Sequence, residues 1–242
     1  MDLNDKLKTI AEMWGADFFG VADLAAVHGA ILEQGGPLIA AYPRAISIGM
    51  TIPHAIVDQL PQRAERVVAV NYRHHGYDVI NQRLELLASL IGGELQRAGH
   101  QALPMPASKR IDDERICAAF SHKLAARLAG FGWIGKNCLL VTPEAGPRVR
   151  WTTVLTDAPM PGANRPMEDG CGSCRQCVEI CPVQAFTGEP FRTAEPREAR
   201  FDARKCDRYF AWLRKKDPQL AVCGLCLYVC PHGRERKRES AG

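Results

Sequence analysis

Eight of the ten cysteines lie between residues 171 and 230, and seven of these eight form two closely spaced runs. The first run, CGSCRQCVEICP, begins at Cys171 and has the spacing C-x₂-C-x₂-C-x₃-C-P. This spacing is typical of bacterial [4Fe–4S] proteins, in which the thiolates ligate iron. The second run, CGLCLYVCP, begins at Cys223 and has the same ending but lacks one cysteine. The two runs therefore predict two clusters, one of which takes a ligand from elsewhere in the chain.

The missing ligand is predicted to be Cys206. In two-cluster proteins of this kind the last cysteine of a run ligates the other cluster. Cys206 is the nearest cysteine that this rule leaves unassigned. The first set of ligands is then Cys171, Cys174, Cys177 and Cys230, and the second set is Cys181, Cys206, Cys223 and Cys226.

Zinc is the alternative to iron at these thiols. Paired C-x₂-C units also build Cys₄ zinc sites. Such sites require neither the third cysteine of the first run nor the proline after each run, so we favour clusters. The two remaining cysteines, Cys117 and Cys138, have no partner at ligand spacing and are interpreted as small buried apolar residues.

The segment AGFGWIGKN contains three glycines that match G-x-G-x-x-G. A dinucleotide fingerprint follows a strand and opens a helix, whereas this segment is predicted to follow a helix and precede a strand. One hypothesis is a plain tight turn. The other is a surface for a planar cofactor, because Gly132 and Gly135 let the backbone approach a ring closely. Trp133 would then form an apolar wall, and Lys136 would reach a polar group at the cofactor's periphery.

Hydrophobic periodicity predicts a mixed fold. Helices are expected over 3–15, 80–100 and 117–130, and extended segments over 17–24, 44–53, 101–108, 138–142 and 148–157. The last two strands are expected to pair across the turn PEAGP, and prolines between 159 and 166 indicate a linker. Regular strand–helix alternation is lacking, so the fold class is predicted as α+β.

The composition indicates an ordinary globular chain. Its 242 residues, 46% of them hydrophobic, suffice for one sizeable core and a smaller second unit. The start of the chain does not resemble a signal peptide, and no apolar run is long enough to cross a membrane, so we expect a soluble, cytoplasmic protein. The net charge of +4 is too small to argue for nucleic-acid binding, and residues 234–242 are interpreted as a flexible basic tail.

With these motifs in place, the chain resembles the epoxyqueuosine reductase family. The resemblance rests on FFGVADL, YPRAISIGM, AGFGWIGKN with the strands that follow it, and the cysteine module with its displaced Cys206. It implies a nitroreductase-like, corrinoid-binding domain over about 1–163 and a ferredoxin-like double [4Fe–4S] domain over about 164–233. It further implies that the clusters pass electrons to the cobalt of cobalamin, which deoxygenates an epoxide on a tRNA nucleoside. Reductive dehalogenases are a related group.

The chain departs from that family in two ways. The stretch LPMPASKRIDDERICAAFSHK has no carboxylate where the family carries a catalytic acid. The candidates to replace it are His122, which titrates near neutral pH, and Asp112. The helical repeats that often follow the clusters are also missing. Both departures count against tRNA, so we expect it to be a poor substrate.

The function predicted from the sequence is that of an iron–sulfur oxidoreductase that delivers low-potential electrons to a corrinoid. Its donor would be a ferredoxin or flavodoxin, and its acceptor a small molecule or a corrinoid protein. One alternative is an electron-transfer protein whose N-terminal domain only docks a partner. Another is a flavin-dependent reductase, because nitroreductase-like folds often hold FMN.

Overall fold

The computed structural model describes residues 2–163 and 165–233. The chain divides into two compact units, and each unit is assembled from three separate stretches. Unit 1 comprises residues 1–51, 79–131 and 150–167, and unit 2 comprises residues 52–78, 132–149 and 168–242. The cysteine-bearing stretch thus packs with two earlier stretches of chain. The predicted linear boundary near residue 163 stays a prediction, and the predicted basic tail lies outside the described residues.

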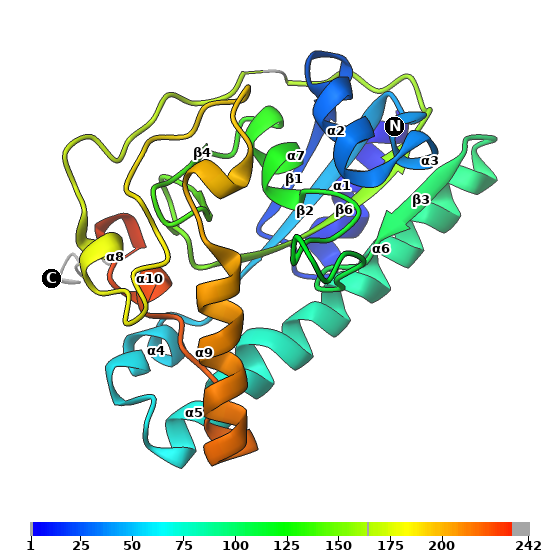
Figure 1. Cartoon of the computed structure of the whole chain (residues 1–242). Coiled ribbons are helices and arrows are strands. Elements are labelled where there is room, and N and C mark those ends of the chain that lie inside the picture. The colour runs from blue at the N-terminus through cyan, green and yellow to red at the C-terminus, as the bar shows by residue number, and fades with distance from the viewer. Residues whose placement is uncertain (1, 164, 234–242) are drawn as a thin grey trace, which may run out of the picture. The chain divides into compact units, whose positions relative to one another are not determined.

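Unit 1 is built on a four-stranded sheet with the strand order β1-β2-β6-β3 (Figure 1). The strands are β1 (Phe18–Asp23), β2 (Arg44–Thr51), β3 (Ala102–Met105) and β6 (Val149–Thr156). β1 pairs antiparallel with β2, and β3 pairs antiparallel with β6. In β2, the six residues between its two ends are buried, as expected for an apolar, β-branched segment in the middle of a sheet. These strands confirm the extended segments predicted around them.

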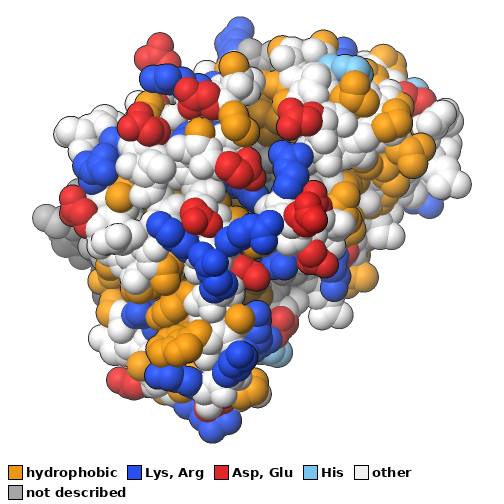
Figure 2. Space-filling model, in the orientation of Figure 1, with side chains coloured by type: hydrophobic (Ala, Val, Ile, Leu, Met, Phe, Trp, Pro, Cys, Tyr) orange, Lys and Arg blue, Asp and Glu red, His pale blue; other side chains and the backbone are white. Residues whose placement is uncertain are grey.

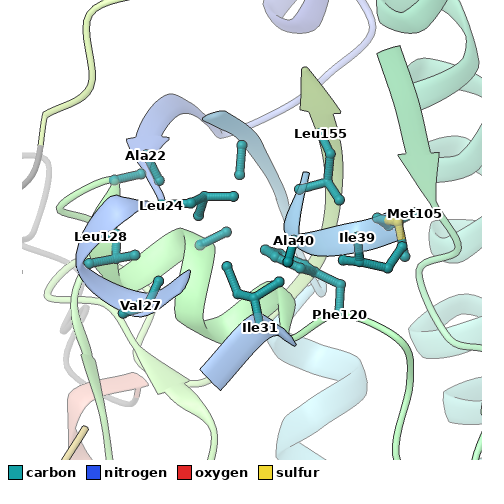
Figure 3. Close-up of a cluster of buried hydrophobic side chains, with 13 residues drawn as sticks. Ala22, Leu24, Val27, Ile31, Ile39, Ala40, Met105, Phe120, Leu128 and Leu155 are labelled. Carbon is teal, nitrogen blue, oxygen red and sulfur yellow. The ribbon is translucent and has the colours of Figure 1, made fainter. Parts of the chain in front are cut away.

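One face of this sheet is covered by the helices α2 (His28–Gly35), α3 (Pro37–Ala40) and α7 (His122–Leu128). Figure 3 shows the core between them, in which side chains from the helices meet side chains from the strands. Ala22 and Ala45 are paired across β1 and β2 and both belong to this core. Because side chains alternate along a strand, their neighbours Val21 and Ile46, also paired, point to the opposite face.

The helices α1 (Leu3–Met13) and α6 (Ile80–Arg97) pack against each other and against the sheet. Asp2 caps α1 by accepting a hydrogen bond from the backbone N–H of Asp5, at 2.8 Å. α6 buries a stripe at helical spacing that consists of Ile80, Leu84, Leu87, Ala88, Ile91, Gly92 and Leu95. A Cβ on Gly92 would lie 3.0 Å from the ring of Pro104 in β3, so this glycine lets helix and strand pack closely. Both helices confirm the sequence prediction.

The helix predicted over 117–130 is shorter than expected, since α7 begins at His122. Cys117 instead forms an antiparallel bridge with Asp112, and its N–H donates to the Asp112 carbonyl at 3.2 Å. Ser121 has an extended backbone. The apolar residues before the helix were misread as its first turn, although Phe120 enters the core from a loop.

The hairpin predicted between residues 138–142 and 148–157 is also wrong. The strand β5 (Leu140–Val141) pairs with β4 (Trp133–Ile134) instead. A tight bridge between Thr142 and Gly146 closes the turn after β5, and the chain then leaves to join the sheet of unit 1 as β6. The segment GWIGKN is therefore one half of a small β-hairpin inside unit 2.

Unit 2 contains short helices joined by long loops. They are α4 (His54–Asp58), α5 (Arg66–Arg73), α8 (Gln176–Glu179), α9 (Ala203–Lys216) and α10 (Leu225–Tyr228). α10 packs against both α4 and α8. Buried Arg148 donates to Asp58 at 2.8 Å and so joins two of the three stretches of the unit. His74 and His75 lie exposed in a π-helical turn. Among the described residues, no helix combines the length and hydropathy required to cross a membrane.

Candidate iron–sulfur centre

The first set of cysteines lines one pocket of unit 2. Cys171 and Cys174 lie on a loop, Cys177 lies in α8, and Cys230 follows α10. The contact between α8 and α10 brings Cys230 to the other three thiols across the sequence. The loop is tightened locally, because Cys174 N–H donates to the Cys171 carbonyl at 3.0 Å and Asp169 accepts from Cys171 N–H at 3.0 Å.

The electrostatics of this pocket favour a cationic occupant. Burial raises the pKa of Cys177 to about 11, and the nearby Cys171 and Cys174 raise it further. Burial raises the pKa of Cys230 to about 12, and all three other members of the set add to this rise. Four thiols that oppose one another's ionisation in a partly dry pocket become thiolates when iron supplies the compensating charge.

The second set gathers in the same way. Burial raises the pKa of Cys206 to about 11, with further contributions from Cys223 and Cys181. Burial raises the pKa of Cys226 well above its ordinary value, and the thiols of Cys223, Cys206 and Cys181 add to this rise. Cys177, from the first set, also raises the pKa of Cys226, so the two sets are close enough to interact electrostatically. This grouping supports the predicted ligand assignment, which stays a prediction for each individual thiol.

The residues between Cys206 and Cys223 explain the displaced ligand. They form most of α9 and a 3₁₀ turn, Pro218–Leu220, and Asp217 caps this turn by accepting from Gln219 N–H at 2.8 Å. α9 itself is capped by Asp202, which accepts from Lys205 N–H at 3.1 Å. An inserted helix has therefore replaced the short gap of the ordinary run, and Cys206 faces the second set from this helix.

Trp133 and Lys136, on the segment GWIGKN, contact the loop of the first set. Trp133 is buried and packs with Val141, Cys171 and Cys230. The Lys136 ammonium group donates to the carbonyl oxygens of Gly172 and Cys174, at 2.7 and 3.2 Å. The hairpin thus forms a wall of the first pocket.

Asn137 of the same segment reaches the second cysteine run, where its side-chain amide donates to the Cys226 carbonyl at 3.2 Å. The sequence reasoning missed this residue. The only signal was its place next to Lys136 in the glycine-rich turn.

The two glycines of this segment are enclosed by the chain itself. A Cβ on Gly132 would lie 2.0 Å from the Val141 carbonyl oxygen. A Cβ on Gly135 would lie 2.9 Å from the Val141 side chain and 3.3 Å from the Cys171 sulfur. The close approach that the glycines permit is therefore made by the hairpin and the cysteine loop. The predicted contact of these residues with a planar cofactor stays a prediction, and their surroundings fit a cluster pocket rather than a corrinoid face.

The two candidate acids lie in unit 1. His122 Nδ1 is 2.9 Å from Thr153 Oγ1, and Nε2 is 3.0 Å from the Pro106 carbonyl oxygen, which accepts from Nε2–H. Burial lowers the pKa of His122 to about 4, so the ring is neutral at pH 7. Asp112 Oδ1 accepts from the N–H groups of Glu114 and Arg115, each at 2.8 Å, as the cap of a turn. These hydrogen bonds give both candidate acids, His122 and Asp112, a structural role.

No three His, Cys, Asp or Glu side chains in the described part of the chain are arranged around a single metal ion. Residues 170–233 match the family model for the 4Fe-4S double cluster binding domain. The clusters favoured from the cysteine spacing are thus supported by an independent comparison.

Curated relatives are epoxyqueuosine reductases. That of Pseudomonas aeruginosa is 30% identical over 240 residues, which cover 90% of this chain and 59% of the relative. That of Escherichia coli is 26% identical over 243 residues, which cover 96% of this chain and 60% of the relative. The chain therefore spans about three fifths of the length of these two relatives.

Solved structures share the fold. An epoxyqueuosine reductase matches with a TM-score of 0.61 at 20% identity, over 96% of this chain and 66% of that chain. The catabolic reductive dehalogenase NpRdhA matches with a TM-score of 0.68 at 22% identity, over 97% of this chain and 33% of that chain. The resemblance and the fold class predicted from the sequence are confirmed: the chain is similar to epoxyqueuosine reductases in sequence and fold, and residues 170–233 match a double [4Fe–4S] binding domain.

Proposed function

We propose that the chain is an iron–sulfur oxidoreductase that carries single electrons through two adjacent [4Fe–4S] clusters to an acceptor cofactor. The observation that carries this proposal is the proximity of thiols within unit 2, where Cys226 interacts with the other predicted ligands of the second set and Cys230 with those of the first. When bound, the clusters supply one-electron chemistry at a potential that their ligands and surroundings tune.

The residues of the chain have distinct tasks in this function. The first and second sets hold iron. Lys136 fixes the first loop and places a positive charge beside thiolates, where the negative charge of the site would otherwise be uncompensated. Trp133 and Val141 exclude water from one side of the first pocket, which strengthens the electrostatic interactions inside it.

The acceptor that we propose is a corrinoid. Its support is the fold that unit 1 and unit 2 share with reductive dehalogenases, one of which is described as B12-dependent. A chain that reduces the corrinoid of a partner protein is the second candidate. It is favoured by the surroundings of Gly132, Gly135 and Lys136, whose close neighbours are the hairpin and the cysteine loop of the chain itself. FMN is the remaining alternative.

A titration of the anaerobically reconstituted full chain tests these acceptors. The protein is first assayed for iron and acid-labile sulfide, reduced with dithionite and examined by electron paramagnetic resonance. Cob(II)alamin and FMN are then added separately, and binding is followed by their visible spectra. Spectral shifts with cobalamin alone support the resident corrinoid. If the clusters are reduced normally but the chain binds neither cofactor, the chain reduces the corrinoid of a partner protein. Two zinc ions per chain without acid-labile sulfide would overturn the whole proposal.

A further inference from the structure

The helix α9 presents two very different sides. Cys206 lies on the side that faces the other thiols of the second set. On the other side, helical spacing aligns Arg204, Arg208, Trp212 and Lys215, and all four side chains are exposed. Lys205 and Lys216 flank this row and are exposed as well. We call these six residues the α9 stripe.

The stripe is basic and aromatic, and it contains no acidic residue. Figure 2 shows Lys and Arg side chains gathered over α9. Trp212 is 49% exposed, stacks on Tyr209 with ring centroids 5.8 Å apart, and carries the Lys216 ammonium 3.8 Å from its ring centroid. A large exposed indole held in a fixed orientation among cations is typical of a recognition surface.

Helix stability does not account for all of these charges. Cations in the last turn of a helix interact favourably with the helix dipole, and this interaction accounts for Lys215 and Lys216. Arg204 and Lys205 lie in the first turn, where the dipole disfavours a positive charge. Among the described residues, Arg204, Arg208 and Lys215 form no ion pair. The Lys205 ammonium group donates to the Gln184 carbonyl oxygen at 3.2 Å, so within the first turn it is the charge of Arg204 that is left without an intramolecular reason.

We propose that the α9 stripe is the docking surface for a small acidic electron-carrier protein, which reduces the cluster held by the second set. This inference rests on the proposed function and names the partner and its entry point. Charge complementarity indicates an acidic partner, because attraction between an acidic face of the partner and the basic stripe steers their association. The position of Cys206 indicates that the partner is an electron carrier. A carrier bound to the stripe lies one helix diameter, about 10 Å, from this predicted ligand of the second set.

Single-stranded or stem-loop RNA is the competing occupant, since a basic groove with an exposed aromatic ring also suits nucleic acid. The observations favour the electron carrier. The stripe is on the helix that supplies a cluster ligand, and electrons must enter unit 2 at a thiol set. An RNA bound at the stripe would neither donate nor accept electrons, so its closeness to the cluster would serve no purpose.

The test uses the reconstituted full chain and a bacterial flavodoxin, which is an acidic protein with a bound FMN. The variant is Arg204→Glu with Arg208→Glu, and the control is Lys8→Glu with Lys109→Glu, which changes the net charge equally on exposed residues of unit 1. Binding of flavodoxin is measured at low and high ionic strength. The rate of cluster reduction is measured with reduced flavodoxin and, separately, with dithionite.

The proposal predicts that the α9 variant binds flavodoxin about ten-fold more weakly and is reduced by it correspondingly more slowly, with the difference shrinking as salt is added. Its reduction by dithionite should equal that of the wild type, and the control should bind flavodoxin normally. Unchanged binding of flavodoxin by the α9 variant overturns the proposal. So does a result in which the α9 variant loses affinity for an RNA stem-loop but not for flavodoxin. Those outcomes leave the proposed function intact, whereas a wild-type chain that assembles no clusters removes both.

Discussion

The ammonium group of Lys136 lies 2.7 Å from the carbonyl oxygen of Gly172. This bond joins the β4–β5 hairpin to the loop that carries the first cysteines, and a second bond to the Cys174 carbonyl reinforces it. Lys136 is only 9% exposed, so its charge is held in a largely dry place. A buried cation needs compensating negative charge, which the thiolates of the first set would provide.

We therefore expect Lys136→Met to loosen the first cluster. Each hydrogen bond from a charged group contributes about 1.5–3 kcal/mol, so iron should leave the first set at least about ten-fold faster. Iron release to a chelator from the anaerobic protein measures this rate. Lys109→Met, at an exposed position, is the control. Equal release from both variants would show that Lys136 is not a support of the cluster loop.

Trp133 is expected to tune the potential of the first cluster. Burial raises the pKa of the Cys171 thiol, and the Lys136 backbone N–H and the Trp133 indole N–H oppose this rise by pointing at the sulfur. Among the described residues, the Trp133 indole N–H forms no hydrogen bond, so it is available to donate to a ligand sulfur. Donation toward a ligand sulfur stabilises the reduced, more negative cluster and so raises its potential.

Trp133→Phe should consequently lower the midpoint potential of one cluster and leave the other unchanged. A net bond of about 0.5–1.5 kcal/mol corresponds to about 20–65 mV for one electron. A redox titration followed by electron paramagnetic resonance measures both potentials. Trp212→Phe, on exposed α9, is the matched control. A Trp133→Phe protein with two wild-type potentials would rule out this role.

The local parts of the site could be predicted from the sequence. The C-x₂-C spacings predicted a double [4Fe–4S] module, and residues 170–233 match the family model for such a domain. The assignment of each thiol to a cluster, including displaced Cys206, stays a prediction. Cysteine spacing is informative because a ligand run must wrap one cluster within a few residues. The strands and long helices followed from periodicity for the same reason, since each buries one face.

The partners of the GWIGKN segment could not be predicted in this way. Its glycines indicated a close approach, but the approaching group is the Cys171 loop, which lies in a distant stretch of the sequence. The same holds for Arg148 and Asp58, whose ion pair joins two stretches of unit 2 that the linear reading had placed in the N-terminal domain. Long-range packing decides such contacts, and no local pattern records it.

The removal of one predicted ligand should affect half of the iron. The full chain is expected to hold about eight irons and eight sulfides, because each cube has four of each. Cys206→Ala should lose the cluster of the second set and retain the first. Cys117→Ala, at a cysteine outside both sets, should keep all of its iron. Iron and sulfide analysis decides, and a Cys206→Ala protein with full iron content would refute the assignment.

The chain is expected to convert epoxyqueuosine in tRNA poorly. His122 is neutral at pH 7, and the Asp112 carboxylate is committed to the N–H groups of a turn. Loss of a general acid typically slows a reaction by about 10²–10⁴-fold. The reductase of Pseudomonas aeruginosa, assayed on the same modified tRNA, is the positive control. Comparable rates for the two proteins would contradict this expectation and direct attention back to these two side chains.

The last prediction concerns the acid stability of unit 1. The folded chain holds the pKa of His122 at about 4, below the ordinary value of 6.5. The neutral ring therefore stabilises the fold fully above pH 6.5, and this contribution declines as the pH falls from 6.5 toward 4, because the unfolded chain takes up the proton first. The loss amounts to about 3 kcal/mol at the acid end of that window. His122→Gln removes the titrating group, so its free energy of unfolding in urea should fall less than that of the wild type between pH 7 and pH 4. His28→Gln, at an exposed histidine of unit 1, should behave as the wild type does. If all three proteins lose the same stability over this interval, the pKa of His122 is not lowered as its burial requires.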